Sequence, residues 1–398
     1  MKRIFITAMV VVASATASAQ ENAKPKDDGF EFTTIKEIPI TSVKDQNRSG
    51  TCWAFSSLGF FEAELLRMGK GEYNLCEMFL AHKTYEDRAR ASVRMHGDIS
   101  FSQGGSFYDA VYCMKNYGMV PEEAMPLPGT LYGDTLANFN EFFPLAESYV
   151  SGIVKSNSKK LSSAWFNGLN GIFDAYLGKI PETFTYKGKT YTPMSFQESL
   201  GLNPDDYVSL TSYSHHPFYE TFIIEVQDNW RWGSSYNLPL DEFMSVMDNA
   251  IQNGYTFAWG ADVSENGFTR NGLAVYPDVT QTADPTGSDM AHWLGLSVSA
   301  RTSEAMRKPW PEKEFTQEER QAEYDNWQTT DDHGMLVYGL AKDQNGKEYF
   351  LVKNSWGKSG MYQGIWYASK AFVRNKTMNI LVHKDAIPKD IKKKLGIK

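Results

Sequence analysis

The chain has 398 residues, with 40 Lys and Arg against 48 Asp and Glu, for a formal net charge of −8. Its 42% hydrophobic and 14% aromatic content excludes an intrinsically disordered chain, and the acidic balance argues against a strongly basic nucleic-acid binder. The length predicts two or three domains, or one large domain with insertions. Three cysteines, Cys52, Cys76 and Cys113, cannot form a disulfide framework, and at least one thiol is left unpaired.

The first residues have the features of an export signal. Met1-Lys2-Arg3 is basic, an apolar run follows from Ile4 to Ala13, and Ala17-Ser18-Ala19 is a small-x-small cleavage site. This combination favours a signal peptide over 1–19 against the alternative, a buried N-terminal helix. We therefore expect an exported protein, periplasmic or secreted, without a membrane anchor after signal cleavage.

The pattern that follows predicts a helical front and a last third richer in strands. Residues 30–43 alternate apolar and polar side chains, which is typical of an extended segment. Cys52 to Met68 is apolar on several faces and is followed by glycines, which indicates a buried helix. The other predicted elements are helices over 74–85, 106–117, 161–177, 238–253 and 316–327 (with a Thr316–Glu319 capping box), a hairpin over 183–192 turning at Lys187-Gly188, and a strand over 257–263.

Cys52 draws attention by its position at the start of the predicted buried helix. The positive end of a helix dipole favours a thiolate there, although an ordinary buried cysteine is the plainer interpretation of that position alone. Six residues earlier, Gln46 lies in a polar loop, from which a side-chain amide could donate to an oxyanion beside the thiol. A loop glutamine taken by itself is merely solvated in most proteins.

A nucleophilic thiol needs a base, and His333 is the best candidate among seven histidines. It precedes a predicted hairpin over 334–353. If that hairpin folds about Gln344-Asn345, paired positions sum to 689 (344 + 345), so His333 faces Trp356 and lies within a few residues of Asn354. The amide oxygen of Asn354 would then fix the imidazole and select its tautomer, while Trp356 would shield it from water.

Two alternatives accompany this interpretation. His292, before Trp293, is the rival base, but it has neither a hairpin nor a downstream Asn. A partly exposed His at a strand end beside an Asn in a turn is the simpler explanation for either residue considered singly.

Taken together, these segments resemble the active-site segments of papain-like cysteine proteases. Gln46 and Ser49-Gly50-Thr51-Cys52-Trp53-Ala54-Phe55 are similar to the Cys segment of that family, Asp332-His333-Gly334 to its His segment, and Lys353-Asn354-Ser355-Trp356-Gly357 to its Asn segment. The four residue types follow in the family's order. The resemblance covers roughly residues 40–125 and 255–385.

The spacing narrows the resemblance to one branch. Cys52 and His333 are 281 positions apart (333 − 52), whereas papain-like enzymes usually separate these residues by about 130–150 positions. The bleomycin hydrolase/aminopeptidase C branch carries an insertion of that order. Segments 101–105 (FSQGG), 115–121 (KNYGMVP) and 259–263 (WGADV) are also similar to that branch.

The resemblance implies an α+β, papain-like two-lobed fold. A helical lobe would carry the Cys helix, an antiparallel β-barrel-like lobe would carry His and Asn, and a large, mostly helical insertion would separate them. The implied ranges are a signal peptide over 1–19, an N-terminal segment and helical lobe over 20–125, the insertion over 126–254, and the β lobe with the C-terminal tail over 255–398.

The resemblance also implies peptide-bond hydrolysis through an acyl-enzyme. In this scheme Cys52 attacks the scissile carbonyl, and His333 protonates the leaving amine and then activates water. Asn354 orients His333. Gln46 and the Cys52 backbone N–H stabilise the oxyanion.

Further residues are implied in supporting and substrate-binding roles. Trp53 and Trp356 would support the site, and Gly104 and Gly105 would line the cleft, where missing side chains let a peptide backbone approach. Peptides are the implied substrates. The resemblance suggests a homo-hexamer, and no metal, cofactor or nucleic-acid partner is expected.

The sequence departs from the family pattern in two places that matter. Ser49 stands where many papain-like enzymes have a disulfide cysteine, and we expect Cys76 and Cys113 to be buried helix thiols without a bridge. In the bleomycin hydrolase branch the C-terminal carboxylate anchors the substrate amine, but here the tail 382–398 ends soon after a short Lys-rich helix. An aminopeptidase is favoured, a papain-like endopeptidase is the alternative, and a catalytically silent binding protein comes third.

Overall fold

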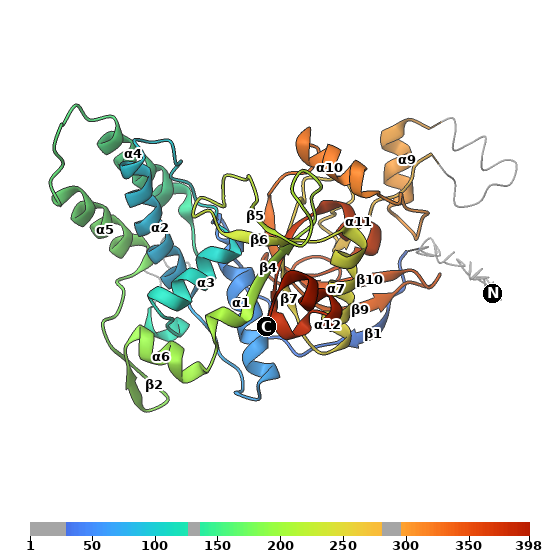
Figure 1. Ribbon diagram of the computed structural model, residues 1–398, viewed down its shortest axis with the longest axis horizontal. Coiled ribbons are helices and arrows are strands. Elements are labelled where there is room, and N and C mark those ends of the chain that lie inside the picture. Colours follow the sequence, from blue (N-terminus) through green and yellow to red (C-terminus); the bar gives the residue numbers. More distant parts are fainter. Residues whose placement is uncertain (1–28, 126–135, 281–295) are drawn as a thin grey trace, which may run out of the picture.

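The computed structural model describes residues 29–125, 136–280 and 296–398. Within these ranges two parts lie side by side: a group of helices, and a large mixed sheet with helices packed around it (Figure 1). The expected α+β, two-lobed, papain-like fold is confirmed. The expected signal peptide over 1–19 and the rival base His292 lie outside the described residues.

The helical part is arranged around one central helix, α1, which packs against α2 and α3 and also against strands of the sheet. Because α1 is enclosed in this way, it is apolar on several faces. In the described part of the chain no helix has both the length and the apolar character needed to cross a membrane. The helices of this part are α1 (Cys52–Arg67), α2 (Glu77–Arg94), α3 (Phe107–Asn116), α4 (Phe139–Val154), α5 (Ala164–Leu177) and α6 (Pro193–Leu200).

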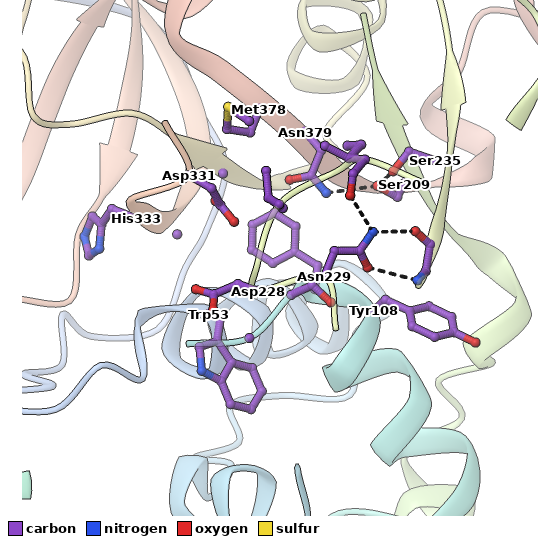
Figure 2. A pocket seen from close by; sticks show the side chains of 18 of the residues that line it. Trp53, Tyr108, Ser209, Asp228, Asn229, Ser235, Asp331, His333, Met378 and Asn379 are labelled. Carbon is purple, nitrogen blue, oxygen red and sulfur yellow. Dashed lines mark hydrogen bonds between the residues drawn. The ribbon is translucent and has the colours of Figure 1, made fainter. Parts of the chain in front are cut away.

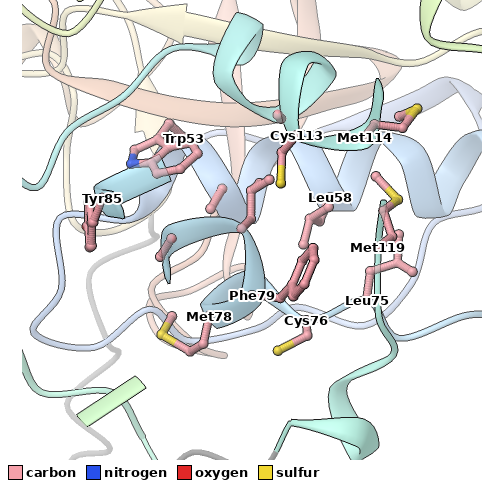
Figure 3. Close-up of a cluster of buried hydrophobic side chains, with 14 of the residues drawn as sticks. Trp53, Leu58, Leu75, Cys76, Met78, Phe79, Tyr85, Cys113, Met114 and Met119 are labelled. Atoms are coloured by element: carbon pink, nitrogen blue, oxygen red, sulfur yellow. The ribbon is translucent and has the colours of Figure 1, made fainter. Parts of the chain in front are cut away.

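Aromatic, aliphatic and sulfur-containing side chains fill the space between α1, α2 and α3 (Figure 3). Cys76 and Cys113 lie in this cluster as free, buried thiols, so the expectation that they are unbridged is confirmed. Cys113 belongs to α3, whereas Cys76 is the N-cap of α2 and its backbone N–H bonds to the carbonyl of Val120. Burial raises the pKa of both thiols, which keeps them protonated and unreactive.

The sheet has the strand order β5-β6-β4-β12-β7-β9-β10-β11-β8, and β1 pairs with β9 at its side. Most neighbours are antiparallel, as expected, but β4–β6 and β8–β11 are parallel pairs. The strands are β1 (Thr33–Glu37), β4 (Tyr207–Thr211), β5 (Thr221–Ile223), β6 (Ser234–Asn237), β7 (Phe257–Ala261), β8 (Leu273–Ala274), β9 (His333–Lys342), β10 (Glu348–Lys353), β11 (Ile365–Ser369) and β12 (Thr377–His383).

Residues from the range expected to be the insertion, 126–254, contribute to both parts of the molecule. Helices α4 to α6 join the helical part, and β2 (Phe184–Tyr186) and β3 (Lys189–Tyr191) form the predicted small hairpin. Strands β4, β5 and β6 extend the large sheet instead, beyond β12. The other α-helices of the described residues are α7 (Leu240–Gln252), α9 (Val298–Ala305), α10 (Gln317–Asp325), α11 (Lys370–Lys376) and α12 (Lys389–Leu395). The division of the chain into domain ranges stays a prediction.

Several helices differ from the sequence-based prediction: α2 is longer than predicted, and α4, α6, α9 and α11 are not predicted at all. The pattern predicts a helix over 74–85, but α2 runs on to Arg94, because its charged second half is covered by other segments: the buried Arg88 donates to the carbonyls of Ser100 and Gly104. Helix α4 is missing from the prediction. It contains Pro144, which removes a backbone donor and weakens the helical signal.

The register of the β9–β10 hairpin decides where the candidate site residues lie. Near the turn Phe350 pairs with Leu340, so the positions sum to 690, one more than predicted. An irregularity in the pairing then shifts the register, and Lys353 pairs with Leu336, which sums to 689. The predicted register is therefore wrong beside the turn and correct at the end of the hairpin that carries His333.

A buried carboxylate on α1 joins several segments around the candidate site. Glu62 is fully buried and accepts hydrogen bonds from the Thr41 hydroxyl (2.5 Å), the Lys44 ammonium (3.1 Å) and the Leu75 backbone N–H (2.9 Å). The ammonium of Lys353, on β10, donates to the same Thr41 hydroxyl at 2.9 Å. One polar network thus links α1 and β10 with the segment before α1 that carries Thr41 and Lys44.

We predict that Glu62→Ala strongly destabilises the fold, because the Thr41 hydroxyl and the Leu75 N–H lose their buried acceptor and the buried ammonium of Lys353 loses the negative charge that supports it. The expected loss in free energy of unfolding is about 3–5 kcal/mol, measured by denaturant titration. Glu198→Ala, which removes an exposed carboxylate from α6, should stay within about 0.5 kcal/mol of the wild-type value. Equal losses in the two variants would contradict the role assigned to the network.

Candidate active site

Cys52 is the first residue of α1, so its thiol lies at the positive end of that helix. The side chain is partly accessible, yet protein atoms surround it closely, and burial raises the pKa of the thiol to about 12. A hydrogen bond with the backbone of Gly334 opposes this effect, whereas the nearby carboxylates of Asp331 and Asp228 add to it. The resting thiol is therefore protonated.

His333 begins β9 and is held on two sides by the residues that follow β10. Its Nε2 lies 2.7 Å from Oδ1 of Asn354, and its ring stacks on the indole of Trp356 with 4.8 Å between centroids. Burial lowers the pKa of the imidazole to about 4, only partly offset by the Asn354 hydrogen bond. His333 is therefore neutral at pH 7, and its ring orientation is fixed.

The hydrogen bonds of Asn354 determine the tautomer of His333. Oδ1 of Asn354 accepts from the backbone N–H of Ser355 at 2.7 Å, which identifies that atom as the oxygen. The imidazole atom facing the same oxygen, Nε2, must then be a donor, so Nδ1 of neutral His333 carries the free lone pair. The sequence-based expectation that Asn354 lies beside His333 agrees with this geometry.

Gln46 is hydrogen-bonded to Ser355, the residue that follows Asn354. Its backbone N–H donates to the carbonyl of Ser355 (2.8 Å), its Oε1 accepts from the Ser355 hydroxyl (2.6 Å), and its Nε2 donates to the carbonyl of Ser49 (2.8 Å). One hydrogen of the amide remains for another acceptor. The three segments that carry Gln46, Cys52 and Asn354 thus come together as the sequence predicts.

The two glycines expected to line a substrate cleft have different surroundings. Gly105 lies against the indole of Trp53, where a Cβ would come within 2.8 Å of the ring, and it lines the pocket beside Cys52. Gly104 does not line this pocket. The carboxylate of Asp228 covers it so closely that a Cβ on Gly104 would lie 1.8 Å from Oδ2. The side-chain Nη1 of Arg88 donates to the Gly104 carbonyl at 2.6 Å.

The pocket beside the thiol is lined by residues from both lobes (Figure 2). Cys52, Trp53 and Gly105 come from the helical side, residues 331–334 come from the start of β9, and the loop between β5 and β6 forms another wall. Gln46, Asn354 and Trp356 are not among the described lining residues.

The charged residues that line the pocket are all acidic. They are Asp228, Asp331 and Asp332, and no Lys or Arg is among the described lining residues. Figure 2 shows Asp331 and Asp228 extending into the same space near His333. Asp331 is exposed at the pocket, yet the many protein atoms around its carboxyl and the carboxylates of Asp228 and Asp332 raise its pKa to about 7. The pocket therefore favours a cationic group.

Asp228 is a residue that the sequence analysis missed. It lies 124 positions after Gly104 (228 − 104), in a polar loop whose local sequence has no sign of a functional role. It reaches the cleft because β5 and β6 join the sheet through β4, which pairs with the distant strand β12. Asp331 could have been predicted as a pocket residue from the sequence, because it lies only two residues before His333.

The chain's own C-terminus has a different position. Helix α12 packs into the core of the β part through Ile391 and Leu395, and Lys394 pairs with Glu242 of α7. None of the residues 382–398, all of which are described, lines the pocket.

Comparison with known proteins was made on both sequence and structure. Residues 28–135 match the papain family cysteine protease, and residues 314–397 match the Peptidase C1-like family. The chain is 22% identical to Aminopeptidase G of Lactobacillus delbrueckii subsp. lactis over 394 residues and 22% identical to Aminopeptidase C of Streptococcus thermophilus over 400 residues. Each of these alignments covers 89% of this chain and 83% of the relative.

A solved structure has the same fold. The crystal structure of PepW from Lactobacillus rhamnosis superposes with a TM-score of 0.66 at 18% identity, over 92% of this chain and 84% of that chain.

The expectation of an exported protein, periplasmic or secreted, is wrong by this comparison. The aminopeptidase C homologues are cytoplasmic peptidases of lactic acid bacteria. The residues on which that expectation depended, 1–19, lie outside the described part of the chain.

His333 should give the stability of the protein a measurable pH dependence. Its pKa is about 4 in the folded chain and about 6.5 in an unfolded one. Between these values only the unfolded state binds the proton, so the contribution is complete above pH 6.5 and is lost as the pH falls toward 4. We expect a loss of about 3 kcal/mol over this window, measured by denaturant unfolding at several pH values.

The matched variants are His333→Gln, which should remove this component, and His96→Asn, which replaces an exposed histidine outside the site and should keep the wild-type profile. Identical profiles for the wild type and His333→Gln would refute the lowered pKa.

Proposed function

Because this chain belongs to the papain-like cysteine proteases, in the bleomycin hydrolase/aminopeptidase C branch, and is a cysteine-type peptidase, we propose that it is an aminopeptidase. It would remove the first residue from peptides that have a free α-amino group. The observation that carries this assignment is the position of Asp228 over Gly104, at the edge of a pocket with only acidic charge.

The proposed reaction begins at the neutral thiol–imidazole pair. Nδ1 of His333 takes the proton of the Cys52 thiol as the sulfur attacks the scissile carbonyl carbon. The carbonyl oxygen becomes an oxyanion, which receives hydrogen bonds from the Cys52 backbone N–H and the remaining amide hydrogen of Gln46. His333 then gives its proton to the leaving amine, and the C–N bond breaks to leave a thioester.

Hydrolysis of the thioester reverses these roles. His333 removes a proton from water, the hydroxyl adds to the thioester carbon, and the C–S bond breaks as the thiol regains a proton. Asn354 supports both steps, because its Oδ1 holds the imidazole with Nδ1 available. Trp356 stacks on the ring and keeps water from the hydrogen bond between His333 and Asn354.

The surroundings of Gly104 favour removal of single residues over internal cleavage. In an internal cleavage, the substrate has further residues on the N-terminal side of the cleaved bond. These residues would have to lie against Gly104 and Gly105, where the backbone is not covered by a side chain. The carboxylate of Asp228 already covers Gly104. Nη1 of Arg88 lies 3.6 Å from Oδ1 of Asp228 and forms an ion pair with it. A chain that ends in an ammonium group at this point would be attracted by Asp228 and Asp331 instead of being blocked.

One observation favours the second candidate, a papain-like endopeptidase. The C-terminal tail packs on the β part and leaves the pocket free, so any block must come from Asp228 and its loop. A homo-hexamer and the substrate-binding role of Gly105 remain proposals that follow from the family resemblance.

A peptide library with matched free and N-acetylated ends separates these functions. We expect the full chain to release single residues from free ends at least about 30-fold faster than from acetylated ends, because the blocked peptide has no ammonium group for the carboxylates of Asp228 and Asp331 to attract. Products are measured by mass spectrometry, and Cys52→Ala should release none. Internal cuts at equal rates in both sets would favour the endopeptidase, and no products with an unreactive Cys52 would reject both.

Asp228→Asn tests the proposed amine anchor. The variant keeps the shape of the side chain but removes its charge, so KM for free-amine peptides should rise about 30-fold or more, while preference over acetylated peptides falls. Asp205→Asn, which changes an exposed carboxylate paired with Lys115, should behave as the wild type. Unchanged kinetics in a folded Asp228→Asn protein, verified by its thermal transition, would exclude this role.

A further inference from the structure

A second group of convergent side chains lies on the part of the sheet built by β4, β5 and β6. His215 and His216 follow β4, and Glu225 follows β5. Nε2 of His215 lies 3.1 Å from Oε2 of Glu225, and Nε2 of His216 lies 3.2 Å from Oε1 of the same carboxylate. One ligand atom from each residue falls within 4.8 Å of the others. The sequence analysis did not single out these three residues.

Aromatic packing holds the two imidazoles in place. The ring of His216 stacks on Phe222 with 4.4 Å between centroids, and His215 meets the edge of the same phenyl ring at 5.3 Å. Tyr213 and Tyr324 lie against His215 at 5.9 and 5.7 Å. Rings packed on both sides have few alternative rotamers, so the positions of both Nε2 atoms are largely preset.

Gln321, on α10, fixes the tautomer of His215. Its Nε2 donates to Asp325 (2.8 Å) and its Oε1 accepts from the backbone N–H of Ser214 (2.7 Å), which identifies the amide oxygen. The same oxygen lies 3.2 Å from Nδ1 of His215, so that nitrogen carries a hydrogen. A ring hydrogen given to an amide oxygen in this way is the usual second contact of a metal-binding histidine.

The second nitrogen of each ring faces the same carboxylate. Nε2 of His215 lies 3.1 Å from one oxygen of Glu225, and Nε2 of His216 lies 3.2 Å from the other. A metal ion among the three side chains would satisfy both nitrogens and the carboxylate together.

We propose that His215, His216 and Glu225 form a binding site for a divalent transition-metal ion of the zinc class. Two imidazole nitrogens and one carboxylate are donors that zinc accepts, and the N–O separations of 3.1 and 3.2 Å are about those between neighbouring ligands around a tetrahedral ion with bonds near 2.0 Å. The ligands are half-exposed or exposed, so an ion can enter from solvent.

The position of the site suggests a structural role. Glu225 lies three residues before Asp228, in the loop between β5 and β6 that reaches Gly104. A bound ion would join the start of this loop to the segment after β4, and through Gln321 to α10. The proposal concerns ion binding and does not depend on peptidase activity.

Spectroscopic titration of the full chain tests the site. Cys52→Ala serves as the background protein, so that the accessible thiol contributes no ligand. Co²⁺ is the probe, with Zn²⁺ as the competitor. We expect one equivalent of Co²⁺ to give visible d–d absorption that Zn²⁺ displaces, with an affinity that falls at lower pH because protons compete for the imidazoles.

Three variants in the same background decide whether these residues are the ligands. His215→Ala, His216→Ala and Glu225→Gln should each weaken binding at least 100-fold, whereas His96→Asn, a change of an exposed histidine elsewhere, should not alter it. Zn²⁺ should also raise the thermal transition of the background protein but not that of the three variants. No stoichiometric binding, or binding unaffected by these variants, would overturn the proposal.

Discussion

A single buried carboxylate on α1 is the interaction on which the arrangement of the candidate site depends. Glu62 is bonded by Lys44, two residues before Gln46, and a threonine hydroxyl connects it to Lys353, the neighbour of Asn354. Burial lowers the pKa of Lys353 to about 8, so this ammonium keeps its charge largely through the carboxylate nearby. Because an unpaired buried charge is costly, the segments that carry these site residues cannot shift separately.

The parts of the site that depend on local sequence were predictable. Cys52 lies at the start of a helix whose apolar pattern is continuous, and His333 and Asn354 are only 21 positions apart in one hairpin. A hairpin fixes the pairing of nearby residues through its turn. Even so, the predicted register failed beside the turn, because the turn contains one residue more than predicted: Asp343 bonds to Lys347, and Lys342 pairs with Glu348.

The parts that depend on distant pairing were not predictable. Asp228 reaches Gly104 only because β4 pairs with β12 and carries β6 and β5 with it, and these short strands have no strong period of their own. The second half of α2 has many charged residues, which do not indicate a buried helix. It is buried because Arg88 donates hydrogen bonds to the carbonyls of Ser100 and Gly104. The adjacent pair His215-His216 is visible in the sequence, but nothing local indicates that Glu225 faces it.

The charges around the thiol connect recognition of the substrate with its chemistry. Burial raises the pKa of Cys52, and the carboxylates of Asp331 and Asp228 raise it further, so the resting enzyme disfavours the thiolate. On the proposed function, a substrate ammonium held by these two carboxylates would cancel their field at the sulfur. Transfer of the thiol proton to His333 would then become easier only when a free amino terminus is in place. A peptide with a blocked end would lose both its anchor and this activation, so selectivity would appear in kcat as well as in KM.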